Sequence, residues 1–185
     1  NSFAIIAPIS DKKDYPNYKL NKIYKFDPTK PFQVKSVDGF AMLFNLKRLK
    51  KLSNFSFFDE NFFLYLENDD ICKRLNNIQE KIYIVPKSKI NHLGGGAVDP
   101  KYKDEIELLR NWHWMWSKFY YNKKHYGYFN ALFKVFGNLI SAKMKFFYYL
   151  IFFNSHKRKI YKMRMLGLIN SMLGKKSFHR PKFDN

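Results

Sequence analysis

The sequence predicts a mixed α/β unit followed by basic amphipathic helices. Short β-branched runs surround one segment of helical periodicity in the first part of the chain, which is typical of a mixed α/β fold. The last part carries apolar residues at helical spacing over long stretches. Charge divides the chain in a similar way, because residues 1–107 hold 18 basic and 14 acidic side chains, whereas residues 108–185 hold 16 basic and one acidic.

This charge asymmetry also predicts where the chain divides. At 185 residues and a net charge of +19, one or two compact units are expected. We place a boundary near residue 120, so that residues 1–122 form the α/β unit and residues 123–185 form a basic helical tail. The single cysteine, Cys72, excludes an internal disulfide, fits a reducing compartment and is expected to be a buried filler.

The elements expected in the first unit are short. Its strand candidates are β-branched runs at residues 3–7, 37–44 and 82–86. One helix is expected at about residues 68–78 and another at about residues 103–120. Residues 9–35 are rich in Lys, Asp, Asn, Tyr and Pro and predict an irregular loop, whose length suggests an active-site surface.

The most informative segment, residues 57–74, places an aromatic block directly before a run of carboxylates. The aromatic residues must pack, whereas the acids resist burial unless they are paired or used for chemistry. Such a conflict between neighbours is typical of a functional site. The carboxylates are Asp59, Glu60, Glu67, Asp69 and Asp70.

The helix that begins in this segment brings three charged residues to one face. Glu67, Asp70 and Arg74 lie three and four positions apart, so Asp70 and Arg74 are expected to pair. The pair would keep the Asp70 carboxylate ionised and fixed, as a general base or an acceptor-binding group requires. The alternative is an ordinary helix N-terminus, enriched in acids because they suit its dipole.

The same segment resembles a known signature. Residues 58–74 follow the pattern Phe-Asp-Glu-x-Phe-Phe-x-Tyr-x-Glu-(Asp/Asn)-x-Asp-x-Cys-x-Arg of family 2 glycosyltransferases, the rhamnosyltransferase-like inverting enzymes. The resemblance covers roughly residues 3–122 and implies the C-terminal portion of a GT-A fold. It implies transfer of a sugar from a nucleotide-sugar donor to a glycan or lipid-linked acceptor.

The resemblance implies that one carboxylate removes the proton from the acceptor hydroxyl. Many relatives carry Asp immediately after the Glu, but this chain has Asn68, which cannot accept a proton at neutral pH. The base is therefore open among Glu67, Asp70 and Asp69, with Glu67 preferred. For Asp59 and Glu60 the resemblance suggests a part in shaping the acceptor pocket, whereas a strand end followed by a turn would also explain Asp59.

Further donor- and acceptor-binding residues come from the same resemblance. Relatives use the loop equivalent to Asp38 and Gly39 beside the donor diphosphate, although a plain Asp-Gly turn is an alternative. Arg74 is a further candidate binding residue, because it is expected to pair with Asp70. Arg110 resembles an arginine near the donor phosphate or acceptor, and an arginine whose stem covers an apolar helix is the alternative.

His92, just before the glycines at 94–96, resembles a ligand of the divalent metal that bridges the donor phosphates. The implied cofactor is Mg²⁺ or Mn²⁺, which would neutralise charge on the leaving diphosphate. A structural or exposed histidine is the simpler interpretation. The Asp-x-Asp motif of relatives is absent from the sequence. We therefore expect the chain to be the C-terminal part of a longer enzyme and to be inactive alone.

The tail predicts two amphipathic helices, at residues 126–153 and 156–173. In the first, the expected apolar side is Phe129, Leu132, Phe133, Phe136, Leu139, Ile140, Phe147 and Leu150. Basic helices without acids are typical of an anionic membrane surface, so residues 126–173 predict peripheral attachment to the cytoplasmic face of a membrane. The alternative is a hairpin whose two apolar faces are buried together.

Two other functions are compatible with this composition. The basic and aromatic residues would suit a nucleic-acid-binding module, but no nucleic-acid partner is expected because the cations lie opposite the aromatic faces. A structural adaptor at the membrane surface is the third possibility.

Overall fold

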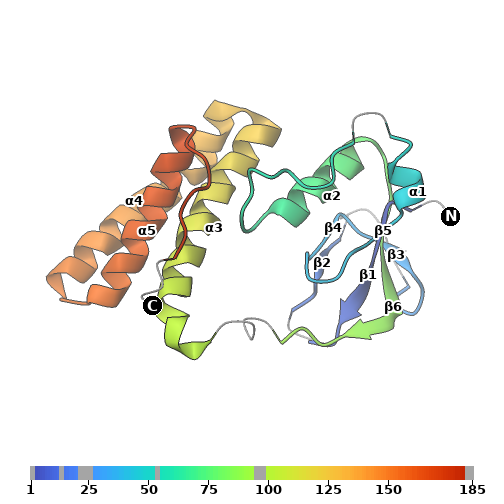
Figure 1. The fold of residues 1–185 in the computed structure, drawn as a ribbon, viewed down its shortest axis with the longest axis horizontal. Coiled ribbons are helices and arrows are strands. Elements are labelled where there is room, and N and C mark those ends of the chain that lie inside the picture. Colours follow the sequence, from blue (N-terminus) through green and yellow to red (C-terminus); the bar gives the residue numbers. More distant parts are fainter. Residues whose placement is uncertain (1–2, 13–14, 21–26, 53–54, 94–98, 182–185) are drawn as a thin grey trace. The chain divides into compact units, whose positions relative to one another are not determined.

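The computed structural model describes residues 3–12, 15–20, 27–52, 55–93 and 99–181. The chain is a mixed α/β protein with two compact units (Figure 1). The first unit comprises residues 1–59 and 67–94, and the second comprises residues 60–66 and 95–185. The first contains the strands and two helices, and the second contains three long helices.

A four-stranded mixed sheet forms the centre of the first unit, in the order β3-β6-β1-β5. Its long strands, β1 (Ile5–Ser10) and β6 (Ile82–Ile90), are parallel, and the edge strands β3 (Phe32–Gln33) and β5 (Leu43–Phe44) are antiparallel to them. A separate two-stranded ladder joins β2 (Tyr18–Lys19) to β4 (Ser36–Val37). Figure 1 shows these strands beside the helices α1 (Leu46–Leu49) and α2 (Glu67–Asn77).

The core of the first unit lies between this sheet and α2. Alternation along β1 buries Ile5 and Ala7, and the apolar stripe of α2 contributes Ile71 and Leu75 to the same cluster. Cys72 is fully buried in this cluster, and burial raises the pKa of its thiol to about 12. The prediction of a buried, unreactive cysteine is confirmed.

The predicted strand at residues 37–44 is wrong in part. β4 ends at Val37, a turn follows, and β5 begins only at Leu43 in a different sheet. The Asp38–Gly39 pair in the middle of this segment favours a turn over a continuous ladder. The strands predicted at residues 3–7 and 82–86 and the helix predicted at 68–78 are confirmed as β1, β6 and α2, with ends shifted by a few residues. The irregular loop predicted at residues 9–35 is wrong in part, because it contains β2 and β3, and β3 pairs with β6 in the main sheet.

Three helices pack together in the second unit: α3 (Lys103–Tyr126), α4 (Tyr128–Ile151) and α5 (Ser155–Met172). A short 3-10 helix, η1 (Pro100–Tyr102), precedes them. Gly127 separates α3 from α4 with a φ of +85°, a conformation that glycine adopts readily. The shared core is Met115, Phe119, Ala131, Val135 and Leu168. None of the helices in the described part of the chain is long and apolar enough to cross a membrane.

The predicted boundary between residues 122 and 123 needs correction. α3 continues without interruption to Tyr126, and the two units divide between residues 94 and 95, with residues 60–66 in the second unit. The reason is that Met115 and Phe119 of α3 are core residues of the three-helix unit. The acids Asp104 and Glu105 belong to the first turn of α3, where they suit its dipole, so the change in charge does not mark the boundary.

The predicted apolar side of α4 is only partly buried. Leu132 and Leu139 pack against the core of the bundle, as the hairpin alternative requires. Phe129, Phe133 and Phe136 remain exposed, although they were assigned to the same side. The residues predicted on one apolar side are therefore divided between two faces, because α4 is apolar both on its inner side and on its outer side.

Candidate active site

The candidate site of the first unit lies where its two parallel strands end. β1 and β6 finish opposite each other at Ser10 and Ile90. Asn17 is buried there, and its side chain accepts a hydrogen bond from the Ser10 N–H at 2.8 Å and donates one to the Pro8 carbonyl at 2.9 Å. The backbone carbonyl of Asn17 in turn accepts from the Asp38 N–H at 2.9 Å. Asn17 therefore ties the Asp38–Gly39 loop to the carboxyl end of β1, where open α/β sheets bind ligands.

The Asp38–Gly39 loop also lies against the first turn of α2. A Cβ added to Gly39 would lie 3.4 Å from Asn68 Cβ and 4.0 Å from Glu67 Oε1. Asn68 donates its side-chain N–H to the Val37 carbonyl at 2.9 Å. Asn68 thus tethers the loop to the helix, a function that an ionised aspartate could not perform because it has no donor.

Glu67 has the most unusual environment of the predicted carboxylates. Its Oε2 atom is buried and has no hydrogen-bond partner in the described structure, while Oε1 faces Gly39. A buried carboxylate oxygen without a partner is costly, and native proteins keep such groups mainly where a ligand or water completes them. Among the predicted catalytic residues, Glu67 is therefore the one that is available for chemistry.

Asp38 and Asp69 form a second acidic group beside this turn, together with two residues from the long loop. Asp69 makes an ion pair with Lys19 at 2.8 Å. Tyr15 donates a hydrogen bond to Asp38, and this bond, followed by burial and the negative charges of Asp38 and Asp69, raises the pKa of the Tyr15 hydroxyl. The loop was predicted to be an active-site surface, but no sequence pattern singled out Tyr15.

His92 lies next to the same loop through an aromatic contact. Its imidazole stacks on the Phe40 ring with centroids 4.3 Å apart and planes 6° apart. Phe40 directly follows Gly39, which lies beside Glu67. The contacts of the first unit thus connect five predicted site residues: Asp38, Gly39, Glu67, Asp69 and His92.

These residues do not by themselves make a complete metal site. Within the described ranges, three ligand atoms come within 4.8 Å of one another only in Asp104, Glu107 and His156 of the second unit. His92 belongs to no such group in that part of the chain, so it offers a single ligand. A divalent ion needs several oxygen or nitrogen ligands, and no group of three His, Cys, Asp or Glu ligands among the described residues includes His92.

Asp70 and Arg74 form the predicted ion pair. The Asp70 carboxylate is fully buried and accepts a hydrogen bond from Arg74 Nε at 2.9 Å. Arg74 also donates to the carbonyls of Ser56 and Phe57. The pair therefore has a structural function, since it holds residues 56–57 against α2, while a catalytic Asp70 and a ligand-binding Arg74 stay predictions.

Three predicted residues remain to be located in the two units. Asp59 ends the first stretch of the first unit, whereas Glu60 and Arg110 belong to the second unit. Glu60 lines a pocket of about 570 Å³ there, together with Phe63, Ser177 and Arg180. Arg110 is exposed on α3.

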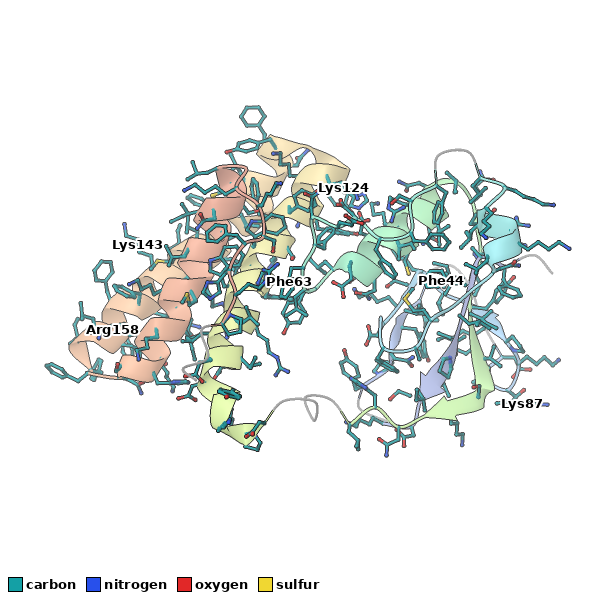
Figure 2. All side chains as sticks on the ribbon, viewed as in Figure 1. Phe44, Phe63, Lys87, Lys124, Lys143 and Arg158 are labelled. Carbon is teal, nitrogen blue, oxygen red and sulfur yellow. The ribbon has the colours of Figure 1, made fainter. Side chains whose placement is uncertain are left out.

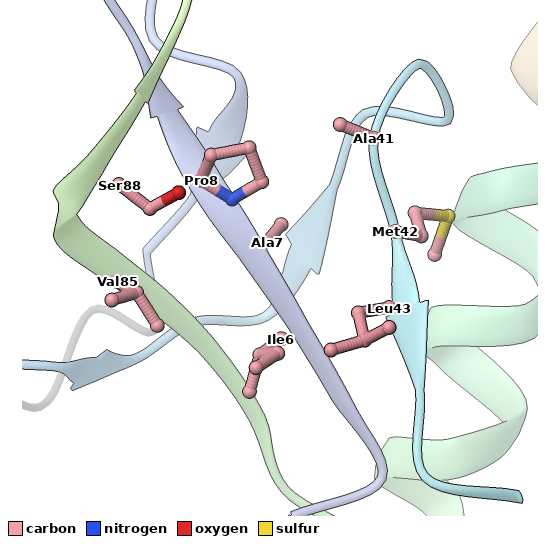
Figure 3. A pocket seen from close by; sticks show the side chains of 8 residues that line it. All are labelled: Ile6, Ala7, Pro8, Ala41, Met42, Leu43, Val85 and Ser88. Atoms are coloured by element: carbon pink, nitrogen blue, oxygen red, sulfur yellow. The ribbon is translucent and has the colours of Figure 1, made fainter.

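The first unit also has a mostly apolar pocket of about 380 Å³ (Figure 3). Its lining comes from β1, β5 and β6 and the residues next to them: Ile6, Ala7, Pro8, Ala41, Met42, Leu43, Val85 and Ser88. Ser88 is the only polar side chain among these lining residues. The pocket suits an apolar group better than a phosphate, and sequence reasoning missed it because its lining comes from three strands that lie far apart in the sequence.

Comparison with known proteins gives no relative: no family model, no curated protein and no solved structure matches this chain. The chemistry of the site is therefore inferred from its own contacts.

Proposed function

We propose that this chain is the acceptor-binding and catalytic part of an inverting glycosyltransferase of family 2 with a GT-A fold. It would transfer a sugar from a nucleotide-sugar donor to a glycan or lipid-linked acceptor. The observation that carries the proposal is the unpartnered, buried oxygen of Glu67 beside Gly39. This pair lies close to the carboxyl ends of parallel strands, the usual place for a ligand in an open α/β sheet.

Glu67 acts as the general base in this proposal. Its carboxylate accepts the proton of the acceptor hydroxyl while that oxygen bonds to the anomeric carbon, and the nucleoside diphosphate leaves from the opposite face of the sugar. Asn68 is a positioning residue, because its hydrogen bond to the Val37 carbonyl fixes the loop that faces Glu67. Asp38 and Asp69 are placed to bind sugar hydroxyls, and Tyr15 and Lys19 orient them.

Mg²⁺ or Mn²⁺ is the cofactor that this function implies. When bound, the ion would neutralise charge on the departing diphosphate, and His92 would supply one of its ligands. Its other ligands are not among the described residues of this site. The roles of Glu67 and Asn68 are therefore assigned without the metal.

The experiment that tests this function uses the full-length reading frame to which these residues belong. Nucleoside diphosphate release is measured with a panel of nucleotide-sugars and glycan or lipid-linked acceptors. Glu67→Gln should lower the rate by about 10²- to 10⁴-fold, the usual contribution of general acid–base catalysis. Glu105→Gln, which removes an exposed carboxylate from α3, is the matched control and should leave the rate unchanged. Equal rates for the two variants would exclude Glu67 as the base.

Nucleic-acid binding is the alternative function, and the charge of the second unit is the observation that favours it. Residues 108–185 carry 16 basic side chains and one acidic one. Binding to oligonucleotides that weakens steeply with salt, without any nucleotide-sugar turnover by the full-length protein, would support this alternative.

A further inference from the structure

α4 carries a stripe of large apolar side chains that point away from the helical bundle. Successive members are three or four positions apart, so they share one face of the helix. All are exposed, and Phe129 and Phe133 keep 84% and 86% of their surface accessible. We call this set the outer stripe: Phe129, Phe133, Phe136, Ile140, Met144, Phe147 and Ile151.

The outer stripe is not needed for the fold of the second unit. Ala131, Val135 and Ala142 of α4 are buried on the other side of the helix. That inner side already satisfies the need of α4 for an apolar contact. Isolated exposed apolar residues are common, but a continuous row of seven is typical of an interaction surface.

Two further phenylalanines extend the outer stripe at the turn after α4. Phe152 and Phe153 are 62% and 93% exposed. Phe153 has a φ of +53°, a left-handed conformation that glycine usually occupies at a helix end. The Asn154 N–H closes this turn on the Tyr149 carbonyl at 3.0 Å. A strained residue whose ring gives nothing to the fold points to a function for that ring.

The charged side chains of α4 and α5 are all basic, and the nearest acids are Asp104 and Glu107 of α3, which contact His156 in the first turn of α5. Lys143 of α4, labelled in Figure 2, is exposed and lies four positions before Phe147, so it shares a face of the helix with this member of the outer stripe. Lys134 and Lys145 lie further around α4, and the first turn of α5 adds Lys157, Arg158 and Lys159. The sequence has no carboxylate from residue 108 to residue 183. The outer stripe is therefore an apolar strip with a positive border.

These charges discriminate between the partners that an apolar face can have. A second copy docked stripe to stripe would bring two positive borders together without a carboxylate from α4 or α5 to compensate them. Nucleic acid requires cations among the aromatic rings, whereas Ile140 and Met144 occupy the middle of the outer stripe and no cation interrupts it. An anionic bilayer offers both a hydrocarbon layer for the outer stripe and negative headgroups for its border.

We propose that the outer stripe and the Phe152–Phe153 turn insert into the interface of an anionic bilayer, with α4 lying parallel to the surface. Lys143 and the cations of α5 would then reach the headgroups. This membrane face differs from the one expected from the sequence, because Leu132 and Leu139 belong to the bundle core and take no part in membrane binding. It is independent of the proposed transferase function, since none of its residues belongs to the candidate active site.

The first test measures binding of the chain to vesicles of phosphatidylcholine with about 30% phosphatidylserine by co-sedimentation. The double variant Phe133→Ser and Phe136→Ser should lower the partition coefficient at least about tenfold. The matched control is Leu173→Ser, which removes a side chain that is 67% exposed but lies outside the outer stripe, and it should stay within about twofold. Vesicles of phosphatidylcholine alone should bind about tenfold more weakly.

Three outcomes would overturn the proposal. The first is an unchanged partition coefficient in the double variant. The second is self-association of the chain, seen by light scattering and lost in the double variant, without vesicle binding. The third is tighter binding to a single-stranded oligonucleotide than to anionic vesicles, with no effect of the double variant on either.

A second test separates membrane binding from folding. Phe153→Gly should raise the melting temperature, because it relieves the left-handed backbone, and should lower the partition coefficient several-fold. A fluorophore sensitive to polarity, attached through Phe153→Cys, should shift to the blue with anionic vesicles. The same probe at Leu173→Cys, an exposed position outside the outer stripe and its cationic border, should not. Cys72 will not interfere because it is fully buried. Equal shifts at the two positions would contradict the proposed orientation.

Discussion

The side-chain amide of Asn68 donates a hydrogen bond to the backbone carbonyl of Val37 at 2.9 Å. This bond joins the first turn of α2 to the Asp38–Gly39 loop across 31 positions of sequence. It gives a structural reason for an asparagine at position 68. An aspartate would lose the donor and would bring a negative charge to the carbonyl oxygen.

Asn68→Asp is therefore expected to destabilise the first unit by about 1–3 kcal/mol, the usual cost of leaving a buried acceptor unpaired. Urea unfolding followed by far-UV circular dichroism measures the change. Asn77→Asp, which adds the same charge at an exposed position of α2, is the control and should cost less. Equal losses in the two variants would mean that the tether does not hold the loop.

We expect the lack of a side chain at Gly39 to matter for ligand binding and not for the backbone conformation of the loop. A Cβ at this position would lie 3.4 Å from Asn68 Cβ, which is an ordinary contact. Gly39→Ala should therefore change the free energy of unfolding by less than about 1 kcal/mol. The added methyl group would still fill space beside Glu67 Oε1 and should weaken donor binding in the full-length protein. Calorimetric titration with nucleotide-sugars measures this loss, and unchanged affinity would remove Gly39 from the site.

Arg74 is expected to matter for stability far more than Lys19, although both pair with an acid of α2. Arg74→Met leaves the fully buried Asp70 without this partner and should cost about 3–5 kcal/mol. Lys19→Met breaks an exposed pair and should cost about 1 kcal/mol or less. Asp70→Asn combined with Arg74→Met should recover part of the loss. A small effect of Arg74→Met on the urea midpoint would contradict the structural role of the pair.

Local patterns in the sequence predict those parts of the molecule that depend on neighbours in the chain. The Asp70–Arg74 pair follows from a spacing of four on a helix, and the stripe of α2 follows from its period. The Asn68–Val37 bond and the contact of Tyr15 with Asp38 join distant segments, so no local pattern reveals them.

The sequence did not predict which face of α4 is buried, for a different reason. Its inner and outer sides are both apolar, so periodicity identifies the helix but does not say which side meets α3 and α5. Small residues decide the matter, because Ala131, Val135 and Ala142 allow the bundle to approach closely, whereas Phe129 and Phe133 would not. The predicted boundary near residue 120 failed similarly, since charge does not report packing.

Two glycines in the bundle predict opposite effects of the same substitution. A Cβ on Gly167 of α5 would lie 2.2 Å from the Trp112 carbonyl of α3, so Gly167→Ala must force the two helices apart and should cost about 3 kcal/mol or more. A Cβ on Gly137 of α4 would meet nothing within 4 Å, so Gly137→Ala should stabilise by about 0.5–1 kcal/mol.

Tryptophan fluorescence during urea unfolding measures both changes. All three tryptophans lie on α3, at positions 112, 114 and 116, so the signal reports the second unit. A small loss from Gly167→Ala would show that α3 and α5 do not approach each other as closely as the structure has them.

The stability of the second unit should fall between pH 6.5 and pH 4 because of His113. Its ring is fully buried, Nε2 donates to the His179 carbonyl at 2.8 Å, and Nδ1 accepts from the Ser177 hydroxyl at 2.8 Å. These two bonds fix the segment after α5 onto α3 and use the neutral ring. Burial is the main cause that lowers the pKa of His113 from 6.5 to about 4.

The free energy of unfolding falls in acid because the unfolded chain binds a proton more readily than the folded chain. Below pH 6.5 the unfolded chain binds a proton at His113 that the folded chain refuses until about pH 4, so acid favours unfolding. The stabilisation is complete above pH 6.5, and about 2 kcal/mol of it should be lost between pH 7 and pH 5. Urea midpoints at these two pH values, followed by tryptophan fluorescence, measure the loss. His113→Gln keeps a donor for the His179 carbonyl but cannot titrate. Its free energy of unfolding should therefore change by about 2 kcal/mol less between the two pH values than that of the unchanged protein. A parallel decline of both proteins would assign the acid sensitivity to other groups.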